Sequence, residues 1–491
     1  MSIAFNEVPA NARTPFVFIE FDNSRAVQSL GSQPYTVLVV GQKTAAGTSP
    51  ELTIENIINA SQAGEKFGFD SQMYHMIKAY RDVDSLTPMV AVSIDDLGAG
   101  VNAIKTVTVP TATATDAGVL ALYVGGRRYQ VGVASADDQD AVALSIIAAV
   151  NADSSAVVTA AAGAASNVVN LTAKNKGTVG NQTDVRTNYN DTDALPPGIV
   201  QPTFAVLTAG SGDPDVQEIL DVIPDDHYNF VVFPWTDSAN LNAIRTEAEE
   251  RNGPTKQVEM MGVTSNADTV GNQTTLGESR NDRFLTIMDV TGPDMPLRWS
   301  AAYTARMVQS AQLDPARPFQ TLSLPGIGAP EKGEERVFEE RNMLLFDGIA
   351  THKVDSGGVV RIERAITTYR QNPQGADDVS YLDVNTYTTL SFIRYDFRNS
   401  FLLKYPRHKL ADDGNNFASG QPVMTPKVGR GFAVNKIQQW NEVAYVENIE
   451  QFIQDLLVER NVSDRNRLDF LVSPDLINQM RIAGVQIAFL L

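Results

Sequence analysis

The chain has 491 residues, which is more than one ordinary domain holds, so we expect two to four domains. Its formal net charge of −19 argues against a protein whose whole surface binds nucleic acid. The absence of cysteine excludes disulfides, thiolate metal sites and cysteine nucleophiles. The longest apolar run, residues 141–150, is much shorter than the roughly 20 residues of a membrane-spanning helix, and no secretion signal is recognisable. We therefore expect a soluble protein that stays in the cytoplasm where it is made.

The first patterned stretch, residues 14–22, predicts a strand with apolar side chains on both faces: Phe16, Val17, Phe18, Ile19 and Phe21. It belongs to an expected N-terminal arm, residues 1–27. A strand at 35–42, helices at 53–63 and 71–81 and a strand at 88–94 then follow. The first of these strands is continuously apolar, as is typical of a strand buried on both faces. This order begins a doubly wound α/β sheet.

The composition changes in residues 99–203, which are rich in Ala, Thr, Val and Asn. The pattern predicts one helix at 136–151 and short strands at 105–109, 119–124, 128–133 and 168–172. Gly125 and Gly126 lie between two alternating runs and indicate a tight hairpin. We interpret the segment as a small α+β domain inserted into a surface loop, where an insertion costs little loop entropy.

The α/β pattern resumes at residue 204 and continues to residue 375. We expect strands at 204–207, 228–233, 257–264 and 283–290. We also expect helices at 216–222, 239–251, 274–281, 296–312 and 334–345, and a hairpin between 352–355 and 359–363. The central α/β domain is therefore predicted to be discontinuous, with residues 28–98 and 204–375 forming one sheet.

A last domain is expected over residues 376–472, with an α+β composition. It holds two amphipathic helices, one capped by Asp383 and ended by Pro406, the other over 449–457. Between them the charge is reversed, through Arg394, Arg398, Lys404, Arg407, Lys409, Lys427, Arg430 and Lys436. This basic stretch is either a solvated face or a docking surface for an acidic partner.

The final stretch, residues 473–491, is expected to be a second extended arm. Its sequence VQIAFLL is nearly uncharged and places Val485, Ile487, Phe489 and Leu491 on one face of a strand. Such strands aggregate unless another chain segment pairs with them. Two alternatives remain open for both arms. They fold back onto their own domain, or they add as strands to identical neighbouring subunits.

No catalytic, cofactor or metal site is predicted. The four histidines lack metal-ligand spacing, no G-x-S-x-G motif is present, and the loop 41–47 lacks the Gly-Lys-Ser/Thr ending of a phosphate loop. Asp213, Asp215, Asp225 and Asp226 border the ends of α/β segments, where carboxylates can bind a divalent ion, but a helix cap explains Asp213 or Asp215 more simply. Gly429 and Gly431 are explained as turn glycines. A doubly wound sheet does not by itself imply an active site.

Three stretches carry a resemblance to a known family. They are IAFNEVPANARTPFVFIEFDNSRAV at 3–27, YLDVNTYTTLSFIRYDFRNSFLLKYPRHKLADDG at 381–414, and LDFLVSPDLINQMRIAGVQIAFLL at 468–491. The chain resembles the tail sheath proteins of contractile-tailed bacteriophages of the Mu-like type along its whole length. The first two stretches are the most specific.

The resemblance implies stacked sixfold rings of subunits around a tail tube. It implies a central domain called subtilisin-like for its shape, although this sequence has no catalytic Asp, His and Ser motif and we expect no protease activity. It also implies terminal arms that add strands to neighbouring C-terminal domains. The arm residues carried over are Phe16, Val17, Phe18, Ile19, Phe21, Ile482, Val485, Ile487 and Phe489.

In the family, the C-terminal domain faces the tube, and the inserted domain is expected outside. Candidate tube-facing residues are Arg407, His408, Lys409, Lys427, Arg430 and Lys436. The implied partners are other copies of the chain, the tail tube protein, and baseplate and tail terminator proteins, without nucleic acid, cofactor or membrane insertion. The implied location is the virion, after assembly in the host cytoplasm.

The predicted function is that of a structural sheath subunit. Rigid-body rearrangement would contract the sheath while the arms keep subunits linked, and so drive the tube through the host envelope. One alternative is an α/β hydrolase or nucleotide-binding enzyme, since doubly wound sheets often carry sites at their strand ends. Another is a different lattice-forming protein, such as a surface-layer subunit.

Overall fold

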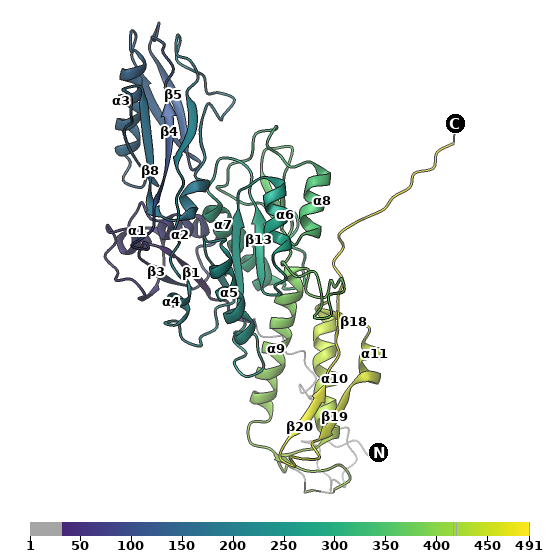
Figure 1. Cartoon of the computed structure of the whole chain (residues 1–491). Helices are drawn as coiled ribbons and strands as arrows, with labels where there is room; N and C mark the ends of the chain where they lie inside the picture. The colour runs from purple at the N-terminus through teal and green to yellow at the C-terminus, as the bar shows by residue number, and fades with distance from the viewer. Residues whose placement is uncertain (1–31, 416, 419, 491) are drawn as a thin grey trace, which may run out of the picture.

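The computed structural model describes residues 32–415, 417–418 and 420–490. Figure 1 shows an elongated molecule in which an inserted unit and a C-terminal unit lie at opposite ends of a central unit. Each unit has its own cluster of buried apolar side chains. Residues Phe16, Val17, Phe18, Ile19 and Phe21 of the expected N-terminal arm lie outside the described residues.

The central unit is built on a six-stranded sheet in the order β13-β12-β11-β1-β3-β2. All neighbouring strands are parallel except β2, which pairs antiparallel with β3 at one edge. The bounds are β1 (Val37–Gln42), β2 (Ile54–Asn56), β3 (Met89–Ile94), β11 (Phe230–Val232), β12 (Met261–Asn266) and β13 (Leu285–Asp289). Strands β1, β11, β12 and β13 are buried along their whole length, and in β1 the continuous apolar run predicts this burial.

Helices cover both faces of this sheet. On β12, position 262 faces Ile244 of α5 (Ser238–Arg251), whereas Ser265 donates a hydrogen bond of 2.6 Å to the carbonyl of Pro296 in α7 (Pro296–Leu313). Side chains three positions apart on a strand point to opposite faces. The remaining elements of the unit are α1 (Ala60–Phe67), α2 (Gln72–Val83), α4 (Gln217–Leu220), α6 (Val270–Glu278), α8 (Phe338–Phe346), β14 (Thr351–Val354) and β15 (Val360–Arg364). The mixed α/β architecture is confirmed.

The expected helix at 53–63 is wrong in its first half. Residues Ile54–Asn56 form β2, because they pair with the edge of β3. The helix α1 begins only at Ala60, where the Asn59 side chain accepts a hydrogen bond of 3.0 Å from the Gln62 N–H. An Asn at this position is a strong start signal for a helix.

The inserted unit has two sheets, β10-β4-β8-β7 and β6-β5-β9, and the helix α3 (Gln139–Asn151). Gly125 and Gly126 both have positive φ, of 57° and 82°, in the hairpin between β5 and β6. The strands are β4 (Asn102–Thr108), β5 (Gly118–Val124), β6 (Arg127–Val133), β7 (Val158–Ala162), β8 (Val168–Lys176), β9 (Val185–Thr187) and β10 (Thr203–Thr208).

Residues 204–207 do not resume the central sheet. They belong to β10, which pairs antiparallel with β4 of the inserted unit. The chain leaves and re-enters the central unit side by side, because Val101 and Ser211 form a β-bridge. Closely spaced ends are what an insertion requires.

The C-terminal unit contains α9 (Val384–Lys404), α10 (Pro426–Glu442) and α11 (Ile449–Asp455). Short strand pairs complete it: β16 (Lys409–Leu410) with β17 (Val423–Met424), β18 (Val446–Glu447) with β21 (Asp475–Leu476), and β19 (Leu457–Arg460) with β20 (Leu468–Leu471). The sequence interpretation extended the last helix to residue 457, but Leu457 begins β19.

The interpretation of Gly429 and Gly431 as turn glycines is wrong, because both lie in α10. Thr425 caps this helix and Pro426 occupies its first turn, where a missing N–H costs little. A Cβ at position 429 would lie 3.1 Å from Leu468 and Phe470. Glycine therefore lets β20 pack closely on α10.

The packing of β12 gives a stability prediction. A Cβ at position 262 would lie 2.6 Å from Ile244 Cγ2, so Gly262→Ala overpacks the sheet and should lower the free energy of unfolding by about 1–3 kcal/mol. Gly271 of α6 has no atom within 4 Å of an added Cβ, so Gly271→Ala should be stabilising by about 0.4–1 kcal/mol. Urea denaturation of both variants measures the difference, and equal midpoints would contradict the packing argument.

Candidate assembly surfaces

At the carboxyl end of β1, the inserted unit covers the edge of the central sheet where an α/β enzyme would bind a ligand. Ligands bind at the carboxyl ends of parallel strands. Here Gln42, at the end of β1, donates hydrogen bonds to Asp96 at 2.7 Å and to the carbonyl of Lys176 at 3.0 Å. Asn175 donates to Asp96 at 2.9 Å. The cavity lined by Gln72 and Asn175 has only about 20 Å³, which is space for about one water molecule.

The titratable side chains near this edge have structural partners. His352 is buried between Thr291 Oγ1 at 3.0 Å and the carbonyl of Asp289 at 3.1 Å, and burial lowers its pKa. Asp213 is not the helix cap that the sequence suggested, because its carboxylate accepts hydrogen bonds from the N–H and Oγ1 of Thr178. The N-cap position of α4 is held by Val216, and the Asp215 side chain accepts a hydrogen bond of 2.9 Å from the Gln217 N–H beside it. Within the described residues, no group of three His, Asp or Glu side chains could hold a metal ion.

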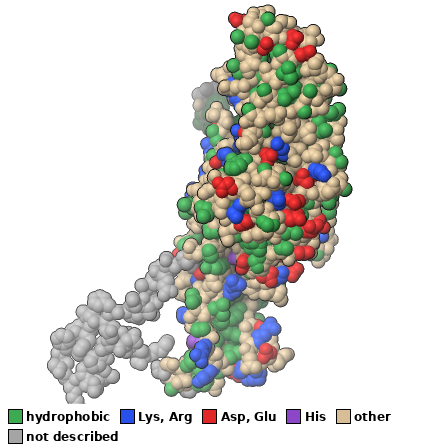
Figure 2. Space-filling model, turned by 90° about the vertical axis from the view of Figure 1, so that its left-hand side faces the viewer, with side chains coloured by type: hydrophobic (Ala, Val, Ile, Leu, Met, Phe, Trp, Pro, Cys, Tyr) green, Lys and Arg blue, Asp and Glu red, His purple; other side chains and the backbone are tan. Residues whose placement is uncertain are grey.

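The candidate tube-facing residues divide into two groups. Arg407, His408, Lys409 and Lys427 are exposed, at the end of α9 and the start of α10. In Figure 2, Lys and Arg side chains lie among apolar side chains on the C-terminal unit, whereas Asp and Glu gather on the central unit. Arg430 is half-buried and donates to the carbonyls of Ile453 and Leu456. Its guanidinium therefore holds the carboxyl end of α11.

Lys436 is buried in the C-terminal unit and cannot belong to an exposed basic surface. Its Nζ lies 2.6 Å from Asp396 of α9, and both side chains are less than a tenth exposed. Trp440 Nε1 donates to the same carboxylate at 2.7 Å. This correction follows from a helix, α10, that the sequence interpretation did not contain. Asp396 therefore links α9 to α10.

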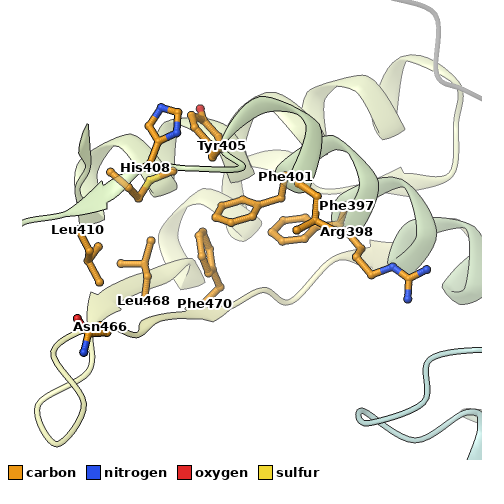
Figure 3. A pocket seen from close by; sticks show the side chains of 11 residues that line it. Phe397, Arg398, Phe401, Tyr405, His408, Leu410, Asn466, Leu468 and Phe470 are labelled. Atoms are coloured by element: carbon orange, nitrogen blue, oxygen red, sulfur yellow. The ribbon is translucent and has the colours of Figure 1, made fainter. Parts of the chain in front are cut away.

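An open apolar groove of about 460 Å³ lies between the carboxyl half of α9 and β20. Figure 3 shows Phe397, Phe401 and Phe470 on its walls, with Tyr405 and His408 at one end. The ring centroids of Phe397 and Phe401 each lie 5.8 Å from that of Phe470, in edge-to-face geometry. In the described part of the chain β20 pairs only with β19, so its second edge has no strand partner there. We call this region the α9–β20 groove.

The segment after β21 leaves the body of the molecule. Ile477 N–H still donates to the carbonyl of Tyr445 at 3.1 Å. Beyond Arg481 the chain extends outward without secondary structure (Figure 1). The four apolar side chains that the sequence singled out are between 76% and 90% exposed: Ile482, Val485, Ile487 and Phe489. In the single chain this segment neither forms a strand nor folds back onto its own body.

Comparison with known proteins identifies the family. A family model described as the phage tail sheath protein central domain matches residues 209–368, and one for the phage tail sheath C-terminal domain matches residues 376–489. The Mu-like prophage FluMu tail sheath protein of Haemophilus influenzae is 35% identical over 492 residues, which cover 100% of each chain. The chain belongs to the phage tail sheath family.

Solved sheath proteins resemble the chain more weakly. The sheath tail protein of Listeria innocua is 12% identical, with 91% of this chain and 93% of that one covered and a TM-score of 0.49. The helical sheath of the anti-feeding prophage in its contracted state is 10% identical, with 97% and 99% covered and a TM-score of 0.49. The identification therefore rests on the sequence relative and the family models.

Family membership identifies a structural protein of the virion, a subunit of a phage tail sheath. The α9–β20 groove and the exposed segment 482–490 both lie almost entirely in the part that the C-terminal family model matches. No helix in the described ranges is long and apolar enough to cross a membrane. The two surfaces with unpartnered apolar side chains thus belong to one sheath domain.

The buried ion pair in this domain gives a second prediction. Asp396→Ala leaves the Lys436 ammonium buried without its partner, which should cost about 3–5 kcal/mol of stability. Asp412 pairs with Arg460 and Arg465 in an exposed position, so Asp412→Ala should cost about 1 kcal/mol or less. Chemical denaturation followed by tryptophan fluorescence compares the two. Equal losses would show that the Asp396–Lys436 pair does not hold α9 to α10.

Proposed function

We propose that this chain polymerises as stacked sixfold rings around a tail tube and forms a contractile sheath. Residues 482–490 of each copy add as a strand beside β20 of a neighbouring copy. The observation that supports this most directly is that the described part of one chain carries both an exposed apolar segment and an open apolar groove beside a strand edge that has no partner there. Residues 14–22 are proposed as the second arm.

The side-chain spacing of the segment suits strand addition. Val485, Ile487 and Phe489 alternate with Gln486 and Ala488, so one face of an added strand is apolar and could enter the groove. Each large apolar side chain that becomes buried contributes about 1.5–3 kcal/mol, and each main-chain hydrogen bond about 0.5–1.5 kcal/mol net. Ordering the backbone costs about 1–2 kcal/mol per residue. The gain per arm is therefore modest, and a sheath of many copies multiplies it.

The elongated shape orients the subunit in this proposal. The inserted and C-terminal units lie at opposite ends (Figure 1), so a C-terminal unit that faces the tube places the inserted unit on the outside. Arg407, His408, Lys409 and Lys427 are the exposed residues proposed to meet the tube. The remaining proposed partners are the baseplate and tail terminator proteins. Assembly is proposed to occur in the host cytoplasm.

Contraction is proposed to need no nucleotide. Each unit has a separate buried core and can move as a rigid body while short linkers bend. The work comes from better burial or charge pairing between units in the contracted state, and the arms keep neighbours connected. The closed carboxyl edge of the central sheet supports a non-catalytic role for this domain, and its subtilisin-like shape remains part of the proposal.

Negative-stain microscopy of the purified protein tests the function directly. Tubes with helical striation are expected, whereas flat arrays would favour another lattice-forming protein. Monodisperse particles that bind a small ligand or turn over a substrate would favour an enzyme. A contraction that requires added ATP would contradict the proposal that better contacts between units in the contracted state supply the work.

A charge in the arm or in the groove should block polymerisation without unfolding the subunit. Ile487 is 83% exposed, and Leu402, in the wall of the groove, is 58% exposed. Ile487→Asp and Leu402→Asp should each prevent tube formation, since a carboxylate buried without a partner costs several kcal/mol. Leu144→Asp is the matched control, because Leu144 is 65% exposed on the inserted unit. Circular dichroism checks the fold and sedimentation measures the polymer. Normal polymerisation of both test variants would contradict the arm-in-groove contact.

Reversal of the exposed basic charges should affect the tube contact alone. Arg407→Glu combined with Lys409→Glu should weaken association with the tail tube but leave empty sheath tubes, because exposed charges steer docking and do not build the subunit core. Lys332→Glu, on an exposed loop of the central unit, serves as the control. Co-sedimentation with the tube protein at low and high salt measures the effect. If Lys332→Glu weakens tube binding as much, the basic surface is not the contact.

A further inference from the structure

The extended segment changes character at Arg481. Upstream, Gln320 Nε2 donates to the carbonyl of Met480 at 3.1 Å. The Arg481 guanidinium then donates to Gln320 Oε1 at 3.1 Å and to Asp383 Oδ1 at 2.9 Å. Its side chain is only 14% exposed, whereas Ile482 is 90% exposed. Arg481 is therefore the last residue of the segment that the body of the molecule holds.

The partner of Arg481 sits where two units meet. Asp383 forms a β-bridge with Ile366 of the central unit and immediately precedes α9 of the C-terminal unit. The sequence suggested that its side chain caps α9, but no such hydrogen bond exists. Its carboxylate accepts two hydrogen bonds from Arg364, at 3.0 and 2.9 Å, as well as the one from Arg481. One carboxylate thus ties β15, the start of α9 and the segment together.

We propose that Arg481 is a positioning residue for assembly: its contacts with Asp383 and Gln320 fix the point and direction in which residues 482–490 leave the subunit. This inference rests on the proposed function of that segment as an inter-subunit arm. We call these contacts of Arg481 with Asp383 and Gln320 the clamp. An extended chain spans at most about 3.3–3.6 Å per residue, so residues 482–490 reach at most about 30 Å from the clamp. If the chain detached from the body as far back as the end of β21, residues 477–481 would also be free and would add about 17 Å of reach.

The length difference explains why a clamp matters. A fixed root confines the segment to grooves within one short radius, and so raises its effective concentration at one neighbour. If Arg481 is not held, the segment samples a larger volume and reaches several neighbouring subunits. Its effective concentration at the correct neighbour is then lower. The ion pair is largely shielded from solvent, so it is weakened less by salt than an exposed pair. Arg481 thereby selects the neighbour without touching it.

Trypsin cleavage of the full-length monomer tests the clamp itself, since trypsin cuts after Arg481. The clamp should protect this bond, whereas Arg465 is 68% exposed and provides an internal control for cleavage. Gln320→Ala and Asp383→Asn weaken the clamp and keep the cleavage site. Both should accelerate cleavage after Arg481 severalfold and leave cleavage after Arg465 unchanged, as measured by mass spectrometry. An unchanged rate after Arg481 in both variants would overturn the proposal.

Assembly of variants at position 481 tests the positioning role. Arg481→Ala leaves Asp383 paired with Arg364, so its unfolding midpoint should match the wild type. Its critical concentration for polymerisation should rise severalfold, and its tubes should be irregular. Arg481→Lys restores one charge and should partly rescue both, while Arg465→Ala should have no effect. Wild-type polymerisation of Arg481→Ala would overturn the positioning role. A wild-type protein that never polymerises would refute the proposed function, and the positioning role with it, although the cleavage rates would still show whether the clamp exists.

Discussion

Apolar side chains that their own chain leaves in water are the constraint on which the rest of this structure depends. Residues 482–490 expose several large apolar side chains, and the α9–β20 groove of the same chain exposes others. Burial of each such side chain would stabilise the protein by a free energy of about 1.5–3 kcal/mol. A single copy does not recover this free energy in the described structure. In the proposed sheath, association between copies recovers it, and family membership identifies the chain as a sheath subunit.

The units that carry the groove and the segment are held together by buried polar contacts. The C-terminal unit joins α9 to α10 through the buried Asp396–Lys436 pair and the Trp440 hydrogen bond. The inserted unit closes the carboxyl edge of the central sheet with amide hydrogen bonds. A groove formed by rigid walls loses little entropy when it is filled, so most of the ordering cost falls on the incoming segment. In the proposed assembly, Arg481 lowers that cost because its hydrogen bonds to Gln320 and Asp383 order the first residues of the segment in advance.

The sequence predicted the elements whose signal is local and missed those that depend on distant partners. The buried strand β1 lies in a continuous apolar run, which predicts it directly, and β12 and β13 overlap the strands expected at 257–264 and 283–290. In contrast, β10 is as apolar as a central strand, and only its pairing with β4 places it in the inserted unit. The helix α10 was overlooked because its glycines suggested a turn, although Thr425 and Pro426 are a helix start signal. The burial of Lys436 was missed for the same reason, because no helix with an apolar face had been assigned around it. Asp383 had the position of a cap, and only the fold reveals the two arginines that take its carboxylate.

In the proposed arrangement, a segment that is held at Arg481 and exposed beyond it resolves a conflict inherent in a contracting polymer. Strong binding between subunits resists rearrangement, and weak binding allows copies to dissociate during it. If the contact is made by a short extended segment, its strand pairing can stay intact while the linker beyond Arg481 changes its dihedral angles. This change costs little free energy, because the residues of the linker are exposed. Gly484 lies within this linker, and no atom lies within 4 Å of the position its Cβ would take. The strength of the attachment and the freedom of the bodies therefore reside in different residues, which lets one change without loss of the other.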